Sequence, residues 1–545
     1  MGRRTLLLLS GLPWLTAATT LPQHREKDVP SASISNAYHI FSSIHDSMRQ
    51  FGSSLNHNGM GVFIAHVPEG TELYHGTSSP YPVNGTEWLA FEPEHAMIFS
   101  RPRRPPPGVG EPPEHGPPRD KCPPRRDPQE DEMTKKHMKP KDPSIDENPR
   151  GIIGALGRLF GQQTSFEAED VADTLNTKEK KNDDEEEKFG YVHTYRTKHA
   201  LRLMYLDGQS AAKSDKGTLD VQDIVIRNVS GASPHGMWEE KLRASEMCRM
   251  AQADYQGHID GILRMEGGFE IILCSFATHL DVVRITADRG SGEGFGGHDG
   301  KAEDLFSYYE AVAARYDGIG AGRVRLDYDN PVTLFAYPEA MYFDSTGRPR
   351  VDNRSTETLE RVRADIKKMV LTPHSKDSDH APTNWQDITD QIIARYADKI
   401  EYMTSGKVAT LKALKGSIDQ AMRPFIDYSA RNTSLEIGRC TRQFWPSGVE
   451  ASSIASLAVR DTYEHLCSSL AAAAGEDDYD GALATVKELK QSLGWTTWKR
   501  CRGCGVHEIC LLPIWPVGSE EDFIQPQCVS SDTIEDRRGN YWRDR

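Results

Sequence analysis

The sequence lacks an excess of positive charge, and it has no long hydrophobic run beyond its first residues. Its 545 residues carry 65 Lys and Arg against 80 Asp and Glu, a formal net charge of −15. Proteins that hold nucleic acid through phosphate contacts need basic surfaces, so the composition argues against a nucleic-acid partner. A membrane-spanning helix needs roughly 20 apolar residues. No stretch reaches that length, and we expect no stable membrane insertion.

The first residues predict export. The basic start Met1–Arg4 precedes an apolar run, Thr5–Leu15, and small residues, Thr16–Ala18. This is the pattern of a signal peptide, predicted over residues 1–18, and it indicates a secreted, extracellular protein. Asn-x-Ser/Thr acceptors agree with export, and the expected glycosylation sites are Asn84, Asn228, Asn353 and Asn432.

Cysteine is sparse in most of the chain, but six of the nine cysteines follow residue 439. In an oxidising compartment such cysteines form disulfides. Cys501, Cys504, His507 and Cys510 have the close spacing of zinc ligands, yet export favours disulfides there and no metal site. The odd count leaves one thiol over, and Cys122 is the candidate.

The hydrophobic content of 37% is sufficient for folded cores, and the pattern along the chain predicts an α+β fold. A single amphipathic helix is expected over Ser35–Leu55. Helices are also expected over Met237–Tyr255 and Glu303–Tyr316. Short β-branched or aromatic runs predict the strands, at 61–67, 72–75, 88–91, 191–195, 201–206, 221–226, 269–276 and 281–285. The mixed N-terminal domain is therefore predicted over residues 35–100 plus 189–350.

Residues 101–188 interrupt this domain. Residues 101–143 alone contain 13 of the 32 prolines, the charge run Lys178–Lys188 follows, and apolar residues are few. Such a segment cannot build a core, so it is predicted to be a long disordered insertion. From residue 355 the apolar spacing becomes helical, which predicts a helical domain over 355–495 and a cysteine-rich C-terminal lobe and tail over 496–545.

The first candidate site residues lie in Tyr74-His75-Gly76-Thr77, which is followed by Trp88-Leu89-Ala90-Phe91. This spacing resembles the opening of ADP-ribosyltransferases of the His-Tyr-Glu type. The resemblance implies NAD as the bound molecule, with His75 on a ribose hydroxyl and Gly76 and Thr77 beside the nicotinamide. It also implies a later glutamate at the reacting centre, for which Glu270 and Glu266 are the candidates. Trp88 and Phe91 stand where those enzymes have a stacking tyrosine.

Other interpretations stay open. Asp260 and Glu266 are carboxylates next to a predicted strand, and a glycoside hydrolase needs two such groups flanking one bond. The glycine-rich segment 288–300 is expected to be a flexible loop, because it lacks the spacing of a phosphate-binding loop. A non-catalytic protein that binds cell-wall polysaccharide or a host surface is the main alternative to an enzyme.

Three longer stretches of the sequence carry a second resemblance. Leu206–Lys213, Gly217–Asp223 and Cys504–Gly518 resemble a family of secreted proteins from filamentous ascomycete fungi to which no activity is generally assigned. This resemblance implies secretion and a fungal origin, and it implies no mechanism.

Overall fold

The computed structural model describes residues 36–102, 189–229, 239–289, 302–372, 383–447, 449, 451–534 and 541–542. The predicted signal peptide, nearly all of the predicted insertion, Cys122 and most of the glycine-rich segment lie outside these residues. The described residues fall within one compact unit, Ile34–Arg545.

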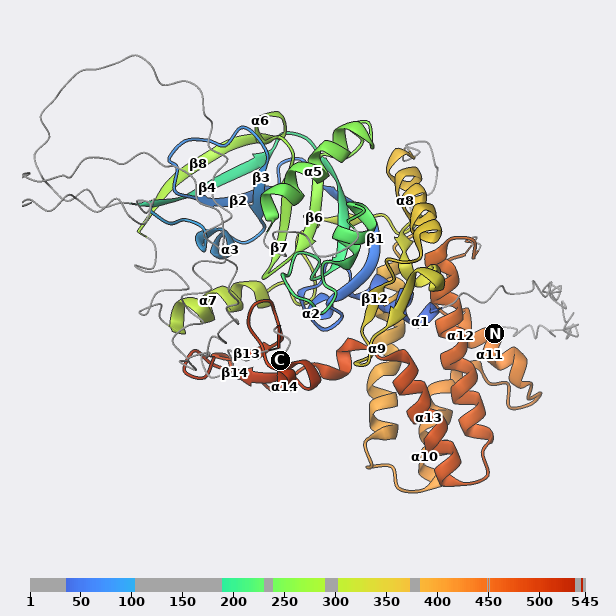
Figure 1. The fold of residues 1–545 in the computed structure, drawn as a ribbon. Helices are drawn as coiled ribbons and strands as arrows, with labels where there is room; N and C mark the ends of the chain where they lie inside the picture. Colours follow the sequence, from blue (N-terminus) through green and yellow to red (C-terminus); the bar gives the residue numbers. More distant parts are fainter. Residues whose placement is uncertain are drawn as a thin grey trace, which may run out of the picture. The chain divides into compact units, whose positions relative to one another are not determined.

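A ten-stranded sheet is built from strands between residues 58 and 333 (Figure 1). Its strands run in the order β10-β1-β5-β6-β7-β3-β2-β4-β8, and β9 also pairs with β1. Neighbours are antiparallel except β5 and β6. The strands are β1 (Asn58–Val67), β2 (Glu72–Thr77), β3 (Glu87–Ala90), β4 (Gly190–Thr197), β5 (Leu201–Gly208), β6 (Gly261–Met265), β7 (Phe269–Leu273), β8 (Leu280–Asp288), β9 (Arg325–Leu326) and β10 (Val332–Thr333).

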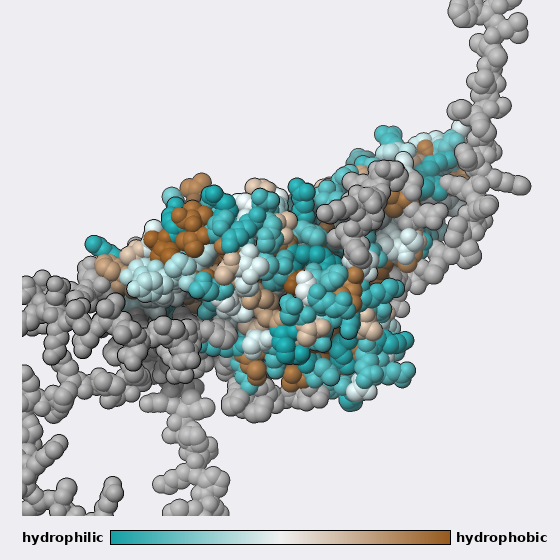
Figure 2. Space-filling view, turned by 90° about the horizontal axis from the view of Figure 1, so that it is seen from above, coloured by the Kyte–Doolittle hydropathy of each residue, from teal (hydrophilic) through white to brown (hydrophobic). Residues whose placement is uncertain are grey.

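Burial changes sharply across the sheet. Every residue of β6 and β7 is buried, which explains why these strands are nearly continuous apolar runs rather than alternating ones. The edge strand β8 is mostly exposed, with Val282 45% and Val283 39% accessible. Figure 2 shows hydrophobic residues gathered at the left end of one face, the side on which Figure 1 draws β8.

Helices accompany the strands, and two of the expectations for them were wrong. The single helix expected over Ser35–Leu55 is two helices, broken where Met48 adopts a φ of 54°. The strand expected at 221–226 is a π-helix, η1, in which Val221 and Val225 are buried one turn apart. Short apolar runs suit either structure, and tertiary packing decides. The elements are α1 (Ala37–Asp46), α2 (Gln50–Leu55), α3 (Pro93–Met97), η1 (Val221–Ile226), α5 (Glu240–Ala253), α6 (Phe276–His279) and α7 (Ala302–Ala313).

The expected helical region is confirmed. Polar side chains cap several of its helices, as when Asn384 accepts hydrogen bonds from the backbone at the start of α9. A small hairpin, β11 (Met341–Phe343) and β12 (Pro349–Val351), precedes this region, with η4 (Leu334–Ala336) and η5 (Pro338–Ala340) before it. The helices are α8 (Thr356–Leu371), α9 (Trp385–Thr404), α10 (Leu411–Met422), η6 (Arg423–Phe425), α11 (Thr433–Thr441), α12 (Ile454–Gly475), α13 (Tyr479–Leu493) and η7 (Thr496–Lys499).

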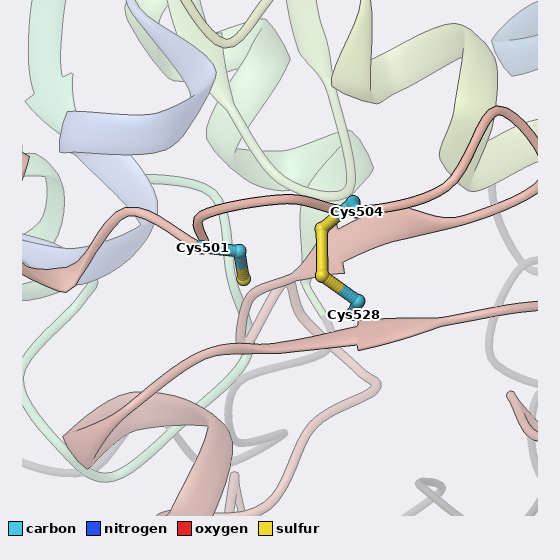
Figure 3. A group of neighbouring side chains, drawn as sticks. All are labelled: Cys501, Cys504 and Cys528. Atoms are coloured by element: carbon cyan, nitrogen blue, oxygen red, sulfur yellow. A yellow bond between two sulfur atoms is a disulfide. The ribbon is translucent and has the colours of Figure 1, made fainter.

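The cysteine-rich end contains β13 (Ile509–Leu511), α14 (Glu520–Ile524) and β14 (Gln527–Val529). The sulfurs of Cys501, Cys504 and Cys528 lie within 4.8 Å of one another, close enough for metal ligands. They are not thiolates, because Cys504 is bonded to Cys528 (Figure 3) and Cys501 is bonded to Cys510. The expected disulfides are therefore confirmed here. Two more pairs join Cys248 to Cys274 and Cys440 to Cys467.

The sheet and the C-terminal helices share a hydrophobic core. One cluster of buried hydrophobic residues includes Phe41 of α1, strands such as β5 and β7, and helices up to Leu493 of α13.

The two flanks of the predicted insertion meet, because a Cβ on Gly190 would lie 2.1 Å from the backbone carbon of Ser100. Within the described ranges, no helix is both long and apolar enough to cross a bilayer.

Candidate functional site

The residues predicted from the His-Gly-Thr sequence meet at one pocket. His75, Gly76 and Thr77 of β2 line one pocket together with Glu270 of β7. Strand β3 brings them together, because its Ala90 pairs with Tyr74 on one side and with Glu270 on the other. The complete lining is Tyr74, His75, Gly76, Thr77, Glu87, Trp88, Leu89, Ala90, His95, Ala96, Phe99 and Glu270.

His75 is buried and has a defined tautomer. Its Nδ1 lies 2.8 Å from the backbone oxygen of Trp88. A carbonyl oxygen only accepts hydrogen bonds, so Nδ1 carries the proton and Nε2 presents a lone pair. Burial lowers the pKa of His75 to about 4, so the ring is neutral at pH 7. His75 can therefore accept a hydrogen bond from a ligand hydroxyl.

Gly76 is required by the fold itself. A Cβ at this position would lie 1.8 Å from the backbone oxygen of Ala96, because α3 passes directly over β2. Its neighbour Thr77 is buried, and its Oγ1 accepts a hydrogen bond from the backbone of Ser79. The glycine thus has a structural reason that does not involve a ligand.

Glu270 is a buried carboxylate with one oxygen held in place. Two nitrogens of Arg264 contact Oε1, each at 2.8 Å, which leaves Oε2 for a ligand. Arg264 is fully buried and also contacts Glu240 of α5. Burial raises the pKa of Glu270, and the Arg264 guanidinium opposes that rise.

Glu266, the other candidate glutamate, does not line this pocket. Its carboxylate pairs with the buried ammonium of Lys213, which itself lies 3.6 Å from Glu240. Burial raises the pKa of Glu266 to about 7, and Lys213 opposes the rise. Glu266 is therefore part of an internal ion network next to the pocket.

The carboxylate pair suggested for a glycoside hydrolase does not converge. Asp260 and Glu266 stand at opposite ends of β6, and a strand of this length separates them by about 20 Å. Glycosidases need their carboxyl groups within about 10 Å. Asp260 instead accepts a hydrogen bond from the backbone of Arg202. That hypothesis was wrong for these two residues.

Two further buried side chains belong to the pocket wall: Trp88, which the sequence pointed to, and His95, which it did not. Trp88 Nε1 and His95 Nδ1 are buried and have no hydrogen-bond partner among the described residues. Unsatisfied buried polar atoms are uncommon in folded proteins. His95 lies four residues after Phe91 in the sequence, but no pattern indicated that α3 would fold over β2.

Comparisons with known proteins give a family resemblance. Residues 24–290 match the family described as the YPL277C N-terminal domain. The uncharacterised Saccharomyces cerevisiae protein YOR389W is 28% identical over 249 residues, 44% of this chain and 32% of that protein. The uncharacterised protein YPL277C of the same organism is 27% identical over 302 residues, 50% of this chain and 52% of that protein. The matched parts thus span only about a third and about half of these relatives.

No solved structure matches the chain significantly. The comparisons support similarity to an uncharacterised fungal family, as the resemblance of the longer sequence stretches implied. The matched proteins have no assigned activity.

Proposed function

We propose that the pocket at His75 binds NAD and catalyses ADP-ribosyl transfer or NAD hydrolysis. One observation carries this proposal: His75 and Glu270 are far apart in sequence but line the same pocket on adjoining parts of the sheet. The sequence around His75 resembles ADP-ribosyltransferases, and that resemblance implies a later glutamate at the reacting centre. Of the two candidate glutamates, Glu270 lines the pocket and Glu266 does not; Glu87 of β3 also lines it.

The chemistry of the two side chains suits this reaction. Nε2 of neutral His75 accepts a hydrogen bond from a ribose hydroxyl, which orients the sugar. The bond from C1′ of the ribose to nicotinamide breaks, and its electron pair leaves with nicotinamide. The carboxylate of Glu270 stabilises the positive charge that develops on the ribose. An acceptor oxygen, from water or another molecule, then bonds to C1′ and loses its proton to solvent.

Thermal unfolding with and without millimolar NAD tests binding. NAD should raise the melting temperature of the wild type, because a ligand that binds only the folded state stabilises it. His75→Ala should abolish the shift. The matched control is His199→Ala, an exposed histidine outside the pocket, which should keep it. No shift with the wild type, or an equal shift in His75→Ala, would refute NAD binding at this pocket.

Release of nicotinamide tests catalysis separately. Glu270→Gln keeps the size of the side chain and removes its charge, so NAD should still shift the melting temperature. Nicotinamide release should fall about 100-fold or more, as expected when a stabilising group is removed from the transition state. Unchanged release would show that Glu270 has no catalytic role.

We also propose that the chain is secreted and N-glycosylated. Support comes from the export-type N-terminus, four disulfides, and the exposure of all four acceptor asparagines, Asn84, Asn228, Asn353 and Asn432. Expression in a yeast host should give protein in the medium whose mass falls after treatment with peptide-N-glycosidase F. Replacement of all four asparagines by Gln should remove that change, and protein retained inside the cell would contradict secretion.

A further inference from the structure

The cysteine-rich end contains a close group of sulfur atoms that the proposed function does not use. The sulfurs of Cys501, Cys504 and Cys528 lie within 4.8 Å of one another, and Cys510 is bonded to Cys501. Two disulfides therefore lie side by side, and Figure 3 shows the Cys501 side chain next to the Cys504–Cys528 bond. We call these four cysteines the sulfur cluster.

Two short pieces of the chain supply the sulfur cluster. Cys501 and Cys504 belong to one bend, in which Gly503 has a φ of 85°, a conformation that favours glycine. Cys510 of β13 and Cys528 of β14 are direct cross-strand partners in the terminal hairpin. Neither pair is bonded within itself, because each cysteine of the bend is bonded to one of the hairpin. The fold thus brings two cysteines from the bend and two from the hairpin to one point.

This arrangement matches the ligand set of a structural zinc ion. Such sites take four thiolates in a tetrahedron, and two of the cysteines commonly have two residues between them, as Cys501 and Cys504 do. Zn–S bonds of about 2.3 Å place the sulfurs about 3.8 Å apart, which falls within the 4.8 Å span of the three grouped sulfurs. The sequence spacing had offered His507 as a ligand, but His507 is exposed. Cys528 takes its place in the structure.

The surroundings of the sulfur cluster suit thiolates. The backbone N–H of Cys501 donates to the sulfur of Cys510, at an N···S distance of 3.2 Å. A hydrogen bond to sulfur stabilises the charged form of the thiol, which is the form that binds a metal. All four cysteines of the cluster are partly exposed, so a small reductant is not shut out. Cys440 and Cys467 of the helical region, by contrast, are fully buried.

We propose that the sulfur cluster binds one zinc ion when its two disulfides are reduced. Each disulfide takes up two electrons and two protons from two molecules of a thiol reductant, which become one disulfide. The four freed thiols release their protons to solvent as Zn²⁺ binds. The disulfide form belongs to an oxidising compartment, and the zinc form belongs to the same chain wherever thiols are kept reduced. Either form joins the bend to the hairpin.

Zinc titration of the full chain before and after reduction tests the proposal. A phosphine that contains no thiol serves as the reductant, and Cys122→Ser in every sample removes the ninth cysteine. The reduced protein should bind one Zn²⁺, which should raise its melting temperature. Co²⁺ in place of zinc should give the absorption of a tetrahedral thiolate site. The oxidised protein should bind neither ion through these sulfurs.

Two single substitutions distinguish this ligand set from the one offered by sequence spacing. Cys528→Ser should weaken zinc binding of the reduced chain by about 100-fold or more, since even loss of a group that only hydrogen-bonds a ligand costs roughly 10–100-fold. His507→Ala should bind zinc like the wild type. The matched control is the double variant Cys248→Ser and Cys274→Ser, which removes a disulfide elsewhere and should keep the zinc site.

Several results would overturn the proposal. They are a reduced protein that binds no zinc, an oxidised protein that binds it equally well, and zinc binding that is lost in His507→Ala but kept in Cys528→Ser. The cobalt spectrum of the reduced wild type provides a test that needs no variant at the cluster, because its charge-transfer absorption grows with the number of thiolate ligands. An intensity that corresponds to fewer than four thiolates would contradict the ligand set, even if Cys528→Ser does not fold.

Discussion

At the residue scale, Gly76 shows how closely backbone segments approach at the pocket. An added methyl group there would overlap the carbonyl oxygen of Ala96, which cannot rotate away as a side chain could. The constraint comes from α3, whose position over β2 also places His95 in the pocket wall.

Gly76→Ala should therefore lower the free energy of unfolding by about 3 kcal/mol or more, since relief of the overlap requires α3 to move. Gly85→Ala is the control, because a Cβ at that position would have no neighbour within 4 Å. Urea denaturation of both variants measures the difference. Equal stability of the two variants would contradict the close packing of α3 on β2.

Asp207 is a second residue with a measurable consequence. Burial raises its pKa to about 6, well above the value of an exposed aspartate. Between pH 4 and pH 6 the folded state holds a proton that the unfolded chain has released. This residue therefore reduces stability as the pH rises through that range.

Asp207→Asn removes this titration and keeps the size of the side chain. Relative to the wild type, the variant should gain about 3 kcal/mol of unfolding free energy between pH 4 and pH 7. Urea denaturation at both values measures the gain. The exposed Asp477→Asn variant should have the same unfolding free energy as the wild type at both pH values. A constant difference between Asp207→Asn and the wild type would show that Asp207 titrates normally.

At the scale of elements, the sequence predicted the strands and helices with strong periodicity and failed where packing decides. The apolar run 201–206 lies within β5, the run 269–276 contains β7, and the helical spacing of apolar residues after residue 355 predicted helices such as α9. The run at 221–226 has the residue types of a strand, yet it forms the helix η1. Its structure is decided by packing against residues that are distant in sequence. That His75 and Glu270 line one pocket depends on strand order, which no single segment encodes.

The β13–β14 hairpin offers a test of disulfide stabilisation. Its strands are short, and the Cys504–Cys528 bond closes a separation of 24 residues. Replacement of both cysteines by Ser should lower stability by about 3 kcal/mol, the effect of freeing a loop of this size. Thermal unfolding measures the loss. Added zinc should not restore stability, because too few ligands remain, and a full rescue by zinc would contradict the disulfide interpretation.

At the scale of the whole molecule, one buried cluster includes residues of both the sheet and the helices. Such a shared core favours cooperative unfolding. Calorimetry should show one main transition for the sheet and helices together. Core substitutions in either part, such as Leu206→Ala or Leu466→Ala, should shift that same transition. Two separate transitions, each sensitive to one substitution, would show independent domains.

The contact between Ser100 and Gly190 has a consequence for how this chain can vary. Two positions 90 residues apart in sequence, by their numbering, are neighbours in space, so a short connection could join them as well as a long one. Loop-closure entropy changes slowly with loop length, so additions and deletions at this point have little effect on stability. The site is a natural place for lineages to differ in length, and for an experimenter to insert a reporter domain without disturbing the sheet.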